Sequence, residues 1–450
     1  MPTEQETTTL ASRLEDLLHG DDVSEAVELL ASIHPADQAD LYIHLDPEAR
    51  VALLALLSSD GLAQLLGHLD EDLRQEMVDG MPRAALAPVL DRAESDIAVD
   101  ILRLLPPAEA ARVLSNMSTA PQITPLLGHA DESAGGLMTR GYVALHKEMT
   151  VAQAMTFLRL SRPLAEEAYY LYVLDADNRL QGVVNLRQLI VSNPQTRIED
   201  VMTADVIAVT AGTDQEEVAR LLQHYRLRAL PVTDENRVLS GIITADDVID
   251  VITEEATEDM YRLAGLDVEA SVLSPVKRSL RRRVPWLVVN LMTAFISALT
   301  VSAFESTISQ VALLAAFMPV IAGHGGNTGT QVSTLVVRGI ALGEVTSRDA
   351  ARIVGKEVAF GLVHGVIVGS LTAVLALILS GNLWLAGVVF GAMIGNVMVA
   401  GIFGAIIPLG LRAIKMDPAL ASAIWLTTFT DVVGFLMLLG AGALLVSKLA

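Results

Sequence analysis

The 450-residue sequence contains no cysteine. It can therefore form no disulfide framework, no thiolate metal site and no cysteine nucleophile, which is compatible with a reducing cytoplasm. Its first residues, MPTEQETTTLASRLEDL, lack a basic stretch followed by an apolar one, so we expect no cleavable secretory signal. The phosphate-loop pattern GxxxxGK[ST] and the zinc-protease pattern HExxH are also missing. Because no nucleophile–base or catalytic-metal spacing occurs either, we expect the protein not to be an enzyme.

Basic residues are scarce in the first part of the chain. Residues 1–275 hold 47 Asp and Glu against 19 Lys and Arg, a net charge of −28, whereas residues 276–450 hold 6 against 12, a net charge of +6. The first part is typical of a soluble region and the second of a membrane region. Repulsion at a net charge of −28 opposes a compact structure, and divalent counter-ions would relieve it. An ordinary solvated acidic surface is the alternative explanation.

The second part carries long apolar stretches. Four of them, roughly 284–304, 358–380, 384–409 and 419–446, reach the about 20 residues that a helix needs to cross the hydrocarbon core. A fifth starts near residue 310, but its apolar run stops at GHGGNTGTQ, residues 323–331. This fifth segment can span the membrane only if the glycine-rich stretch lies at membrane depth, and we then expect five transmembrane helices.

Lys and Arg residues of this part are concentrated in alternate loops. The connections ESTISQ (305–310) and LSGN (379–382) have none. Basic loops face the cytoplasm, so with five spans the acidic part lies inside and the C-terminus outside. We therefore expect a multi-pass protein of the bacterial plasma membrane with cytoplasmic N-terminal domains. The basic loop residues are Lys277, Arg278, Arg281, Arg282, Arg283, Arg338, Arg348, Arg352, Lys356, Arg412 and Lys415.

One acidic residue, Asp431, lies well inside the last apolar stretch. A charged side chain at membrane depth costs at least about 2.5–3.5 kcal/mol, so such a carboxylate usually marks an ion site or pathway. Thr427, one helical turn earlier, can add oxygen ligands. A protonated or hydrogen-bonded carboxyl between helices is the alternative. Asn396 and His364, also in apolar stretches, either belong to such a site or make hydrogen bonds between packed helices.

The stretch GHGGNTGTQ offers uncharged oxygen ligands from Asn327, Thr328, Thr330 and Gln331, while its glycines let the backbone open or pack closely. Oxygen ligands with a single carboxylate suit a hard cation, Mg²⁺ in particular, which keeps several waters when bound. One Asp per chain would make a weak site. We therefore expect two or more chains around a common axis.

Residues 1–130 show no strand-like alternation. Short amphipathic segments are separated by breaks in which Pro or an acidic capping residue precedes an apolar helix face. This pattern predicts stacked helical hairpins in a small all-α superhelix. The breaks lie at 34–37, 45–49, 69–73, 81–85 and 105–110.

Residues 131–252 contain an internal repeat. Met138-Thr139 and Met202-Thr203 begin two units, about 131–200 and 201–252, that are 64 residues apart. Each unit is predicted to run strand, helix, strand, turn, strand, helix. The repeat resembles a tandem pair of CBS domains, an α/β family that commonly senses adenine nucleotides or ions.

The CBS resemblance implies at most one nucleotide site. In that family a GxxTxxD stretch can hold ribose and phosphate. The second unit matches it with Gly241, Thr244 and Asp247, so ATP is a candidate ligand there. The first unit departs from it, with Gly182, Asn185 and Gln188 at the corresponding positions.

The segment after the repeat, 253–275, continues a very acidic helix toward the membrane. Carboxylates four residues apart, such as Glu254 and Glu258, repel one another unless a cation or a basic partner intervenes. The helix is either a solvated connector or a gate that a divalent ion bridges to other acidic surfaces. Its acidic residues are Asp246, Asp247, Asp250, Glu254, Glu255, Glu258 and Asp259.

The order of these parts resembles the MgtE family of magnesium channels: a helical domain (1–130), a CBS pair (131–252), an acidic plug helix (253–275) and five spans (276–450). The most specific pieces are PVIAGHGGNTGTQ and TTFTDVVG. His324 and Thr330 in the first piece depart from the family's pattern, as does the first CBS motif. The resemblance implies a homodimer with a pore on its two-fold axis, where Asp431 of each subunit holds hydrated Mg²⁺. It implies further ligands at Thr427 and Asn327, and a pore lining of Gly325, Gly326, Thr328 and Gln331. It also implies cytosolic Mg²⁺ sensor residues at Asp91, Asp247, Asp250, Glu255, Glu258 and Asp259.

We therefore expect a Mg²⁺-selective channel for Mg²⁺ uptake that closes when cytosolic Mg²⁺ binds these acidic surfaces. Its expected partners are a second copy of the chain, membrane lipid and divalent cations, but no nucleic acid. One alternative is a cation-coupled secondary transporter of Mg²⁺, Co²⁺ or Mn²⁺. The other is a regulatory CBS protein whose membrane part serves as an anchor and transports nothing.

Overall fold

The computed structural model describes residues 4–20, 23–163, 170–267, 276–420 and 423–449. Contacts divide the chain into two compact units, Met1–Ile252 and Thr253–Ala450. Helix α16, Ala245–Leu263, begins in the first unit and ends in the second. The acidic helix thus begins directly after the last CBS strand, and residues 268–275 of the predicted plug segment lie outside the described residues.

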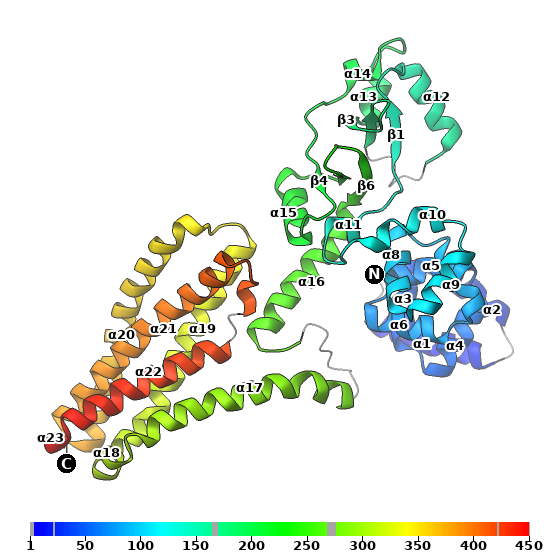
Figure 1. Cartoon of the computed structure of the whole chain (residues 1–450). Coiled ribbons are helices and arrows are strands. Elements are labelled where there is room, and N and C mark those ends of the chain that lie inside the picture. The colour runs from blue at the N-terminus through cyan, green and yellow to red at the C-terminus, as the bar shows by residue number, and fades with distance from the viewer. Residues whose placement is uncertain (1–3, 21–22, 164–169, 268–275, 421–422, 450) are drawn as a thin grey trace. The chain divides into compact units, whose positions relative to one another are not determined.

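The N-terminal helices α1 to α9 pack together (Figure 1). Their starts repeat with a period of 24 residues. Helices α3, α5, α7 and α9 begin at residues 35, 59, 83 and 107, and each packs against the next in this series. The predicted helical hairpins are confirmed. The bounds are α1 Glu4–His19, α2 Val23–Ala31, α3 Pro35–His44, α4 Pro47–Leu56, α5 Ser59–His68, α6 Glu71–Gly80, α7 Arg83–Leu90, α8 Ser95–Leu104, α9 Pro107–Asn116, α10 Ala120–Ile123 and α11 Ala134–Leu137, with a 3₁₀ turn at Leu126–Gly128.

The same side-chain contacts recur from one repeat to the next. Nε of Arg50 donates to the carbonyl of Tyr42 at 3.1 Å, and Nε of Arg74, 24 residues later, donates to the carbonyl of Leu66 at 2.9 Å. Arg50 also pairs with Glu76 at 2.7 Å, and an equivalent pair joins residues 74 and 100. Guanidinium groups therefore bind successive helical hairpins to one another at fixed spacing.

The CBS pair forms two three-stranded sheets, each with one parallel and one antiparallel pairing. Thr139 opens the first CBS repeat, but its backbone pairs with Ile242 of the second CBS repeat. Thr203 of the second CBS repeat pairs in the same way with Val183 of the first. A Cβ atom at Gly241 would lie 2.7 Å from the carbonyl oxygen of Thr139, so this exchange needs a glycine. The elements are β1 Val143–His146, α12 Val151–Ser161, β2 Leu171–Leu174, β3 Leu180–Val184, α13 Leu186–Val191, α14 Ile198–Val201, β4 Val209–Thr210, α15 Gln215–Tyr225, β5 Ala229–Thr233 and β6 Leu239–Thr244.

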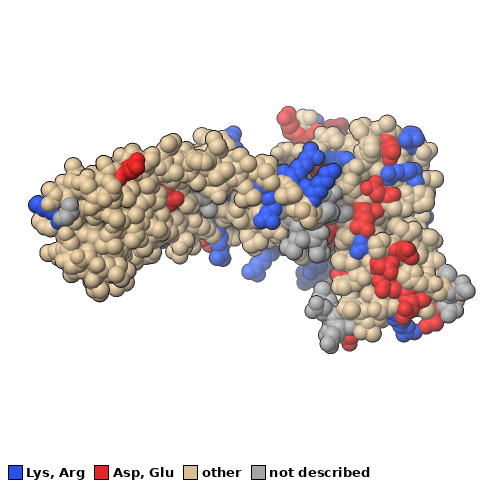
Figure 2. All heavy atoms as spheres, turned by 90° about the horizontal axis from the view of Figure 1, so that it is seen from below, with Lys and Arg blue, Asp and Glu red and all other residues tan. Residues whose placement is uncertain are grey.

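The second unit is a bundle of long helices. Four described helices are long and apolar enough to cross a membrane: Ser279–Ser302 within α17, Ala350–Ser380 (α20), Leu383–Ala413 (α21) and Ile424–Leu444 within α22. One face of this unit carries few charged side chains along most of its length (Figure 2). The remaining elements are α17 Val276–Ser302, α18 Glu305–Gln310, α19 Leu313–Ala341, α22 Ala423–Leu444 and α23 Val446–Leu449, with 3₁₀ turns at Ser347–Asp349 and Pro418–Leu420.

Helix α19 contains the stretch GHGGNTGTQ and is helical throughout its 29 residues. The glycines do not open the backbone here; they allow close packing instead. A Cβ atom at Gly404 of α21 would lie 2.7 Å from the carbonyl oxygen of Gly329 of α19. Because its polar residues keep α19 out of the set of apolar spans, the count of five transmembrane helices stays a prediction.

Candidate functional site

Helices α19 and α22 meet at Gly326 and Thr427, two residues of the ion pathway predicted from the sequence. A Cβ atom at Gly326 would lie 3.5 Å from Cγ2 and 3.7 Å from Oγ1 of Thr427, so the two residues are in contact. Asp431 follows Thr427 by one helical turn on α22 and is partly buried. Within the described ranges no Lys, Arg or His pairs with this carboxylate. An uncompensated carboxylate thus lies beside a hydroxyl-bearing side chain at membrane depth.

The predicted polar residues of α19 divide between two faces. Asn327 and Gln331, four residues apart, are exposed on one face of the helix. Gly325, Gly326 and Thr328 are buried against the neighbouring helices. The hydroxyl of Thr328 donates to the carbonyl of His324 at 2.9 Å within the helix. Among these five predicted residues, the exposed polar groups in a single chain are therefore the side-chain amides of Asn327 and Gln331.

Asn396 of α21 lies fully buried between α19 and α22. Its Nδ2 donates to the carbonyl of Ile321 at 2.8 Å, and a Cβ atom at Gly325 or at Gly434 would lie within 3 Å of it. Its Oδ1 has no hydrogen-bond partner among the described residues. Of the two interpretations that the sequence allowed, the structure shows the hydrogen bond between packed helices.

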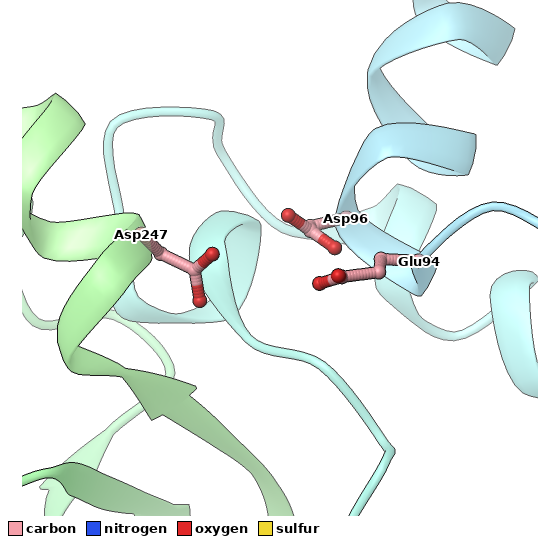
Figure 3. A group of neighbouring side chains, drawn as sticks. All are labelled: Glu94, Asp96 and Asp247. Atoms are coloured by element: carbon pink, nitrogen blue, oxygen red, sulfur yellow. The ribbon is translucent and has the colours of Figure 1, made fainter. Parts of the chain in front are cut away.

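Three carboxylates meet in the first unit (Figure 3). Glu94 and Asp96 at the start of α8 and Asp247 in the first turn of α16 each offer an oxygen within 4.8 Å of the others. Oδ1 of Asp96 is buried without a hydrogen-bond partner among the described side chains. Burial, together with Asp247, Glu94 and Asp100, raises the pKa of Asp96 to about 8. These carboxylates are arranged to gain from a cation.

Asp247 is oriented by hydrogen bonds from Thr244, the residue directly before α16. Its Oδ2 accepts from the hydroxyl of Thr244 at 2.5 Å and from the Thr244 backbone N–H at 3.2 Å. Burial nevertheless raises its pKa above the ordinary range, and Asp246 and Asp250 act in the same direction. Sequence reasoning found Asp247 but missed Glu94 and Asp96. Their sequence, AESDIAVD, has acidic residues before an apolar face, which is also the ordinary pattern of a helix start.

Asp91, the predicted sensor residue among the N-terminal helices, has a different environment. Its carboxylate accepts from the backbone N–H groups of Ser118 and Thr119 at 3.0 and 2.9 Å, and from the Thr119 hydroxyl at 2.8 Å. Burial acts to raise the pKa of Asp91, but these hydrogen bonds outweigh it and hold the pKa below its ordinary value. The carboxylate thus binds the two residues that directly precede α10, and it is not one of the three clustered groups.

Known proteins are similar to this chain over most of its length. A family model described as a divalent cation transporter matches residues 318–441, a model of the MgtE intracellular N domain matches 33–131, and CBS domain models match 134–192 and 198–254. The magnesium transporter MgtE of Thermus thermophilus is 39% identical over 330 residues, 73% of each chain. That of Enterococcus faecalis is 35% identical over 318 residues, 71% of this chain and 70% of the relative.

The chain belongs to the MgtE family. This confirms the resemblance drawn from the sequence, and it confirms that the protein is not an enzyme, since the family consists of transporters. The first unit is also similar to the solved cytosolic domain of the Mg²⁺ channel MgtE in complex with ATP, with 39% identity and a TM-score of 0.51. That similarity covers 54% of this chain and 99% of the other.

A second acidic group of this MgtE-family chain lies at the membrane end of α16. Arg262 forms ion pairs with Glu258 and with Asp417, which lies between α21 and α22. Burial, Asp417 and Glu255 raise the pKa of the neighbouring Asp259 to about 6. Three predicted sensor residues are thus brought together with Asp417. The sequence KMDPAL gave no sign of this role, because Asp before Pro is an ordinary capping pattern.

The two CBS repeats differ at the positions of the GxxTxxD motif. In the second CBS repeat the Thr244 hydroxyl donates to Asp247, and Gly241 packs against Met138 and Thr139. In the first CBS repeat the side chains of Asn185 and Gln188 instead accept from each other's backbone N–H at 2.8 Å, which forms a capping box.

Asp250, the last of the predicted sensor residues, is exposed on α16.

Proposed function

We propose that this MgtE-family chain conducts Mg²⁺ into the cell through a channel. The observation that carries the proposal is Asp431, an intramembrane carboxylate without a cationic partner among the described residues, one turn from Thr427 and beside the polar helix α19. Such a carboxylate attracts a divalent cation, and uncharged oxygens suit Mg²⁺ that keeps part of its water shell. The MgtE relatives are magnesium transporters by name, which supports Mg²⁺ as the transported ion.

The functional unit in this proposal is a homodimer in the bacterial plasma membrane, with the first unit in the cytoplasm. One chain supplies a single carboxylate and leaves Asn327 and Gln331 exposed on α19. Amides facing lipid are unfavourable, whereas amides facing a second copy and water are satisfied. A second α19 and a second Asp431 across a two-fold axis would line a pore. Helix α19 then acts as the fifth span.

Cytosolic Mg²⁺ closes the channel in this proposal. Glu94, Asp96 and Asp247 form one oxygen cluster, and Asp259 and Asp417 form another at the membrane end of α16. Carboxylate oxygens are the ligands Mg²⁺ prefers, so the ion would stabilise the arrangement in which these groups are close. When Mg²⁺ falls, their repulsion favours a looser arrangement and an open pore. The CBS pair, with Gly241 and Thr244, is the proposed ATP site, which the ATP complex of a similar protein supports.

Rescue of a bacterium deficient in Mg²⁺ uptake tests the pore assignment. We expect the wild type to restore growth at low Mg²⁺ and Asp431→Ala to fail, because the carboxylate that holds the ion is gone. Glu344→Gln, which removes an exposed carboxylate from a loop of the same unit, is the matched control and should rescue. Equal rescue by Asp431→Ala, with equal membrane levels, would show that the pore assignment is wrong.

Electrical recording then separates a channel from a coupled carrier. Single-channel Mg²⁺ currents in a bilayer are expected for the wild type. Saturating flux at low rates that needs a Na⁺ or H⁺ gradient would instead show secondary transport, of Mg²⁺ or another divalent cation. A regulatory protein with a mere membrane anchor predicts no effect of Asp431→Asn on Mg²⁺ uptake.

A further inference from the structure

An open groove runs between α21 and α22 in the membrane unit. Its volume is about 450 Å³, and all of its lining residues are apolar. Gly387 and Gly391, one turn apart on α21, are exposed in it, and a Cβ atom at either position would meet no described neighbour within 4 Å. The absence of these two side chains leaves the space along α21 open. The lining includes Trp384, Gly387 and Gly391 of α21, Met437 and Ala441 of α22, and Leu445 directly after it.

The groove is closed at its inner end. Gly395 continues the spacing of Gly387 and Gly391, but Met437 covers it: a Cβ atom at Gly395 would lie 2.4 Å from Sδ of Met437. Because an α-helix rises about 1.5 Å per residue, α21 from Trp384 to Gly395 is about 16 Å long. The hydrocarbon core of a bilayer is about 30 Å thick, so one leaflet contributes about 15 Å. The open length therefore matches one leaflet.

A lysine lies at the other end of the groove. Nζ of Lys448 lies 3.9 Å from the centroid of the Trp384 ring. Asn382 holds both residues in place, because its Nδ2 donates to the carbonyl of Lys448 at 2.9 Å and its Oδ1 accepts from the backbone N–H of Trp384 at 2.8 Å. Lys448 is the only Lys or Arg after Lys415 in the sequence, and it forms no ion pair with an Asp or Glu of the described residues. Its ammonium group can therefore donate to an anion.

These features fit a phospholipid better than a transmembrane helix of a second copy. A phospholipid combines an anionic phosphate at the interface with an acyl chain that ends near the middle of the bilayer. Tryptophan is typical of the interface, and a lysine there attracts anionic headgroups. A helix packed on Gly387 and Gly391 would continue along α21 toward Gly395, where Met437 already lies.

We propose that this groove binds one acyl chain of an outer-leaflet phospholipid whose phosphate accepts from Lys448. The bound chain would fill the space between α21 and α22, and α22 carries Asp431. The lipid would thus stabilise the packing of a helix that contributes to the proposed pore. The proposal goes beyond the channel function and does not depend on it.

Native mass spectrometry of the full-length protein in detergent, with added dioleoylphosphatidylglycerol, tests the groove. We expect the double variant Gly387→Leu/Gly391→Leu to bind this lipid at least about tenfold more weakly than the wild type, because two leucine side chains occupy the space of the acyl chain. The variant should fold, since its added Cβ atoms meet open space and leucine favours a helix more than glycine does. Gly410→Leu, at an exposed and equally open position of α21, is the matched control and should bind normally. Equal binding by the double variant overturns the proposal.

Lys448→Gln tests the phosphate contact. We expect this variant to bind phosphatidylglycerol about fivefold more weakly, because one lysine near anionic lipid contributes about that factor. Dioleoylglycerol, which has the same chains but no phosphate, should bind equally to the variant and the wild type. Glycerol phosphate without acyl chains should not bind measurably. The proposal is overturned if Lys448→Gln binds phosphatidylglycerol normally, or if glycerol phosphate binds as tightly as the lipid.

The same spectra count the chains in each complex. If Gly387→Leu/Gly391→Leu reduced this number, the groove would be an interface between copies and the proposal would be wrong. Mg²⁺ flux enters none of these measurements. A protein that binds the lipid as expected but conducts no Mg²⁺ would therefore refute the channel function alone, and a conducting protein with unaltered lipid binding in the variants would refute the lipid site alone.

Discussion

At the scale of single residues, two aspartates five positions apart have opposite roles because of their immediate neighbours. Asp96 faces other carboxylates and its Oδ1 is buried, so its charged form is disfavoured. Asp91 accepts three hydrogen bonds at a helix start, so its charged form is favoured. The first can respond to a cation, whereas the second has its acceptor capacity largely filled.

Stability should depend on pH through Asp96. Its pKa in the folded protein, about 8, lies above its ordinary value of 3.8, so its contribution is fully present below the ordinary value and is lost as pH rises through about 8. Without Mg²⁺ we expect about 2 kcal/mol less stability at pH 8 than at pH 6 from this group. Asp96→Asn should remove this loss, and scanning calorimetry of the full-length protein measures it.

Asp91→Asn is the matched control for this measurement. The pKa of Asp91 is lowered, so its contribution is present above the ordinary value and is lost only in acid, outside this pH window. The variant should therefore retain the loss of stability between pH 6 and 8. If Asp96→Asn retained it as well, the assignment to Asp96 would be refuted.

At the scale of elements, α19 shows how packing decides the structure of a glycine-rich segment. Isolated glycines disfavour a helix, yet α19 is helical throughout because Gly325, Gly326 and Gly329 let neighbouring helices approach. Each glycine lowers the intrinsic helix propensity but allows a close contact with a neighbouring helix. The contact of Gly326 brings Thr427 of α22 against α19.

Two glycines on α21 test this interpretation. A Cβ atom at Gly404 would lie 2.7 Å from the carbonyl oxygen of Gly329, so Gly404→Ala must separate α21 from α19. We expect a loss of about 1–3 kcal/mol of stability, as for other overpacked contacts. Gly391→Ala is the control, because nothing described lies within 4 Å of its added Cβ. Thermal unfolding monitored by the tryptophans, all three of which lie in the membrane unit, should separate the two variants. Equal unfolding temperatures would contradict the proposed role of Gly404.

Local patterns were predicted from the sequence more completely than the sites were. The helical hairpins and the CBS repeat follow from capping residues and periodicity within short segments, so the sequence contains the needed information. The cluster of Glu94, Asp96 and Asp247 joins helices about 150 residues apart, and no local signal separates its members from ordinary helix caps. The same holds for Asp417 beside Asp259. The position of Asp431 was predictable, because charge inside an apolar stretch is itself local information.

At the scale of the whole molecule, the uneven distribution of charge links the acidic N-terminal part to the ion that we propose it senses. A net charge of −28 over residues 1–275 makes divalent cations favourable partners at many positions. Among the described residues, the groups around Asp96 and Asp259 are two places where acidic side chains lie close together.

Protease protection measures this response over the whole chain. We expect millimolar Mg²⁺ to slow cleavage of the purified protein within residues 130–275 several-fold, because bound ions oppose the repulsion between acidic surfaces. A variant with Asp96→Asn and Asp247→Asn should lose part of this protection. Equal cleavage of the wild type with and without Mg²⁺ would refute the sensor proposal.

The 24-residue period of the N-terminal helices makes this domain adjustable in whole modules. Removal of residues 59–82 would bring Ser58, already a helix cap, directly before Arg83, the first residue of α7. Arg50 would then stand 26 positions before Asp100, the same separation that it now has from Glu76. Evolution or an engineer could therefore shorten or lengthen the domain by one hairpin while keeping its caps and ion pairs in register, and so change its reach without redesigning its interior.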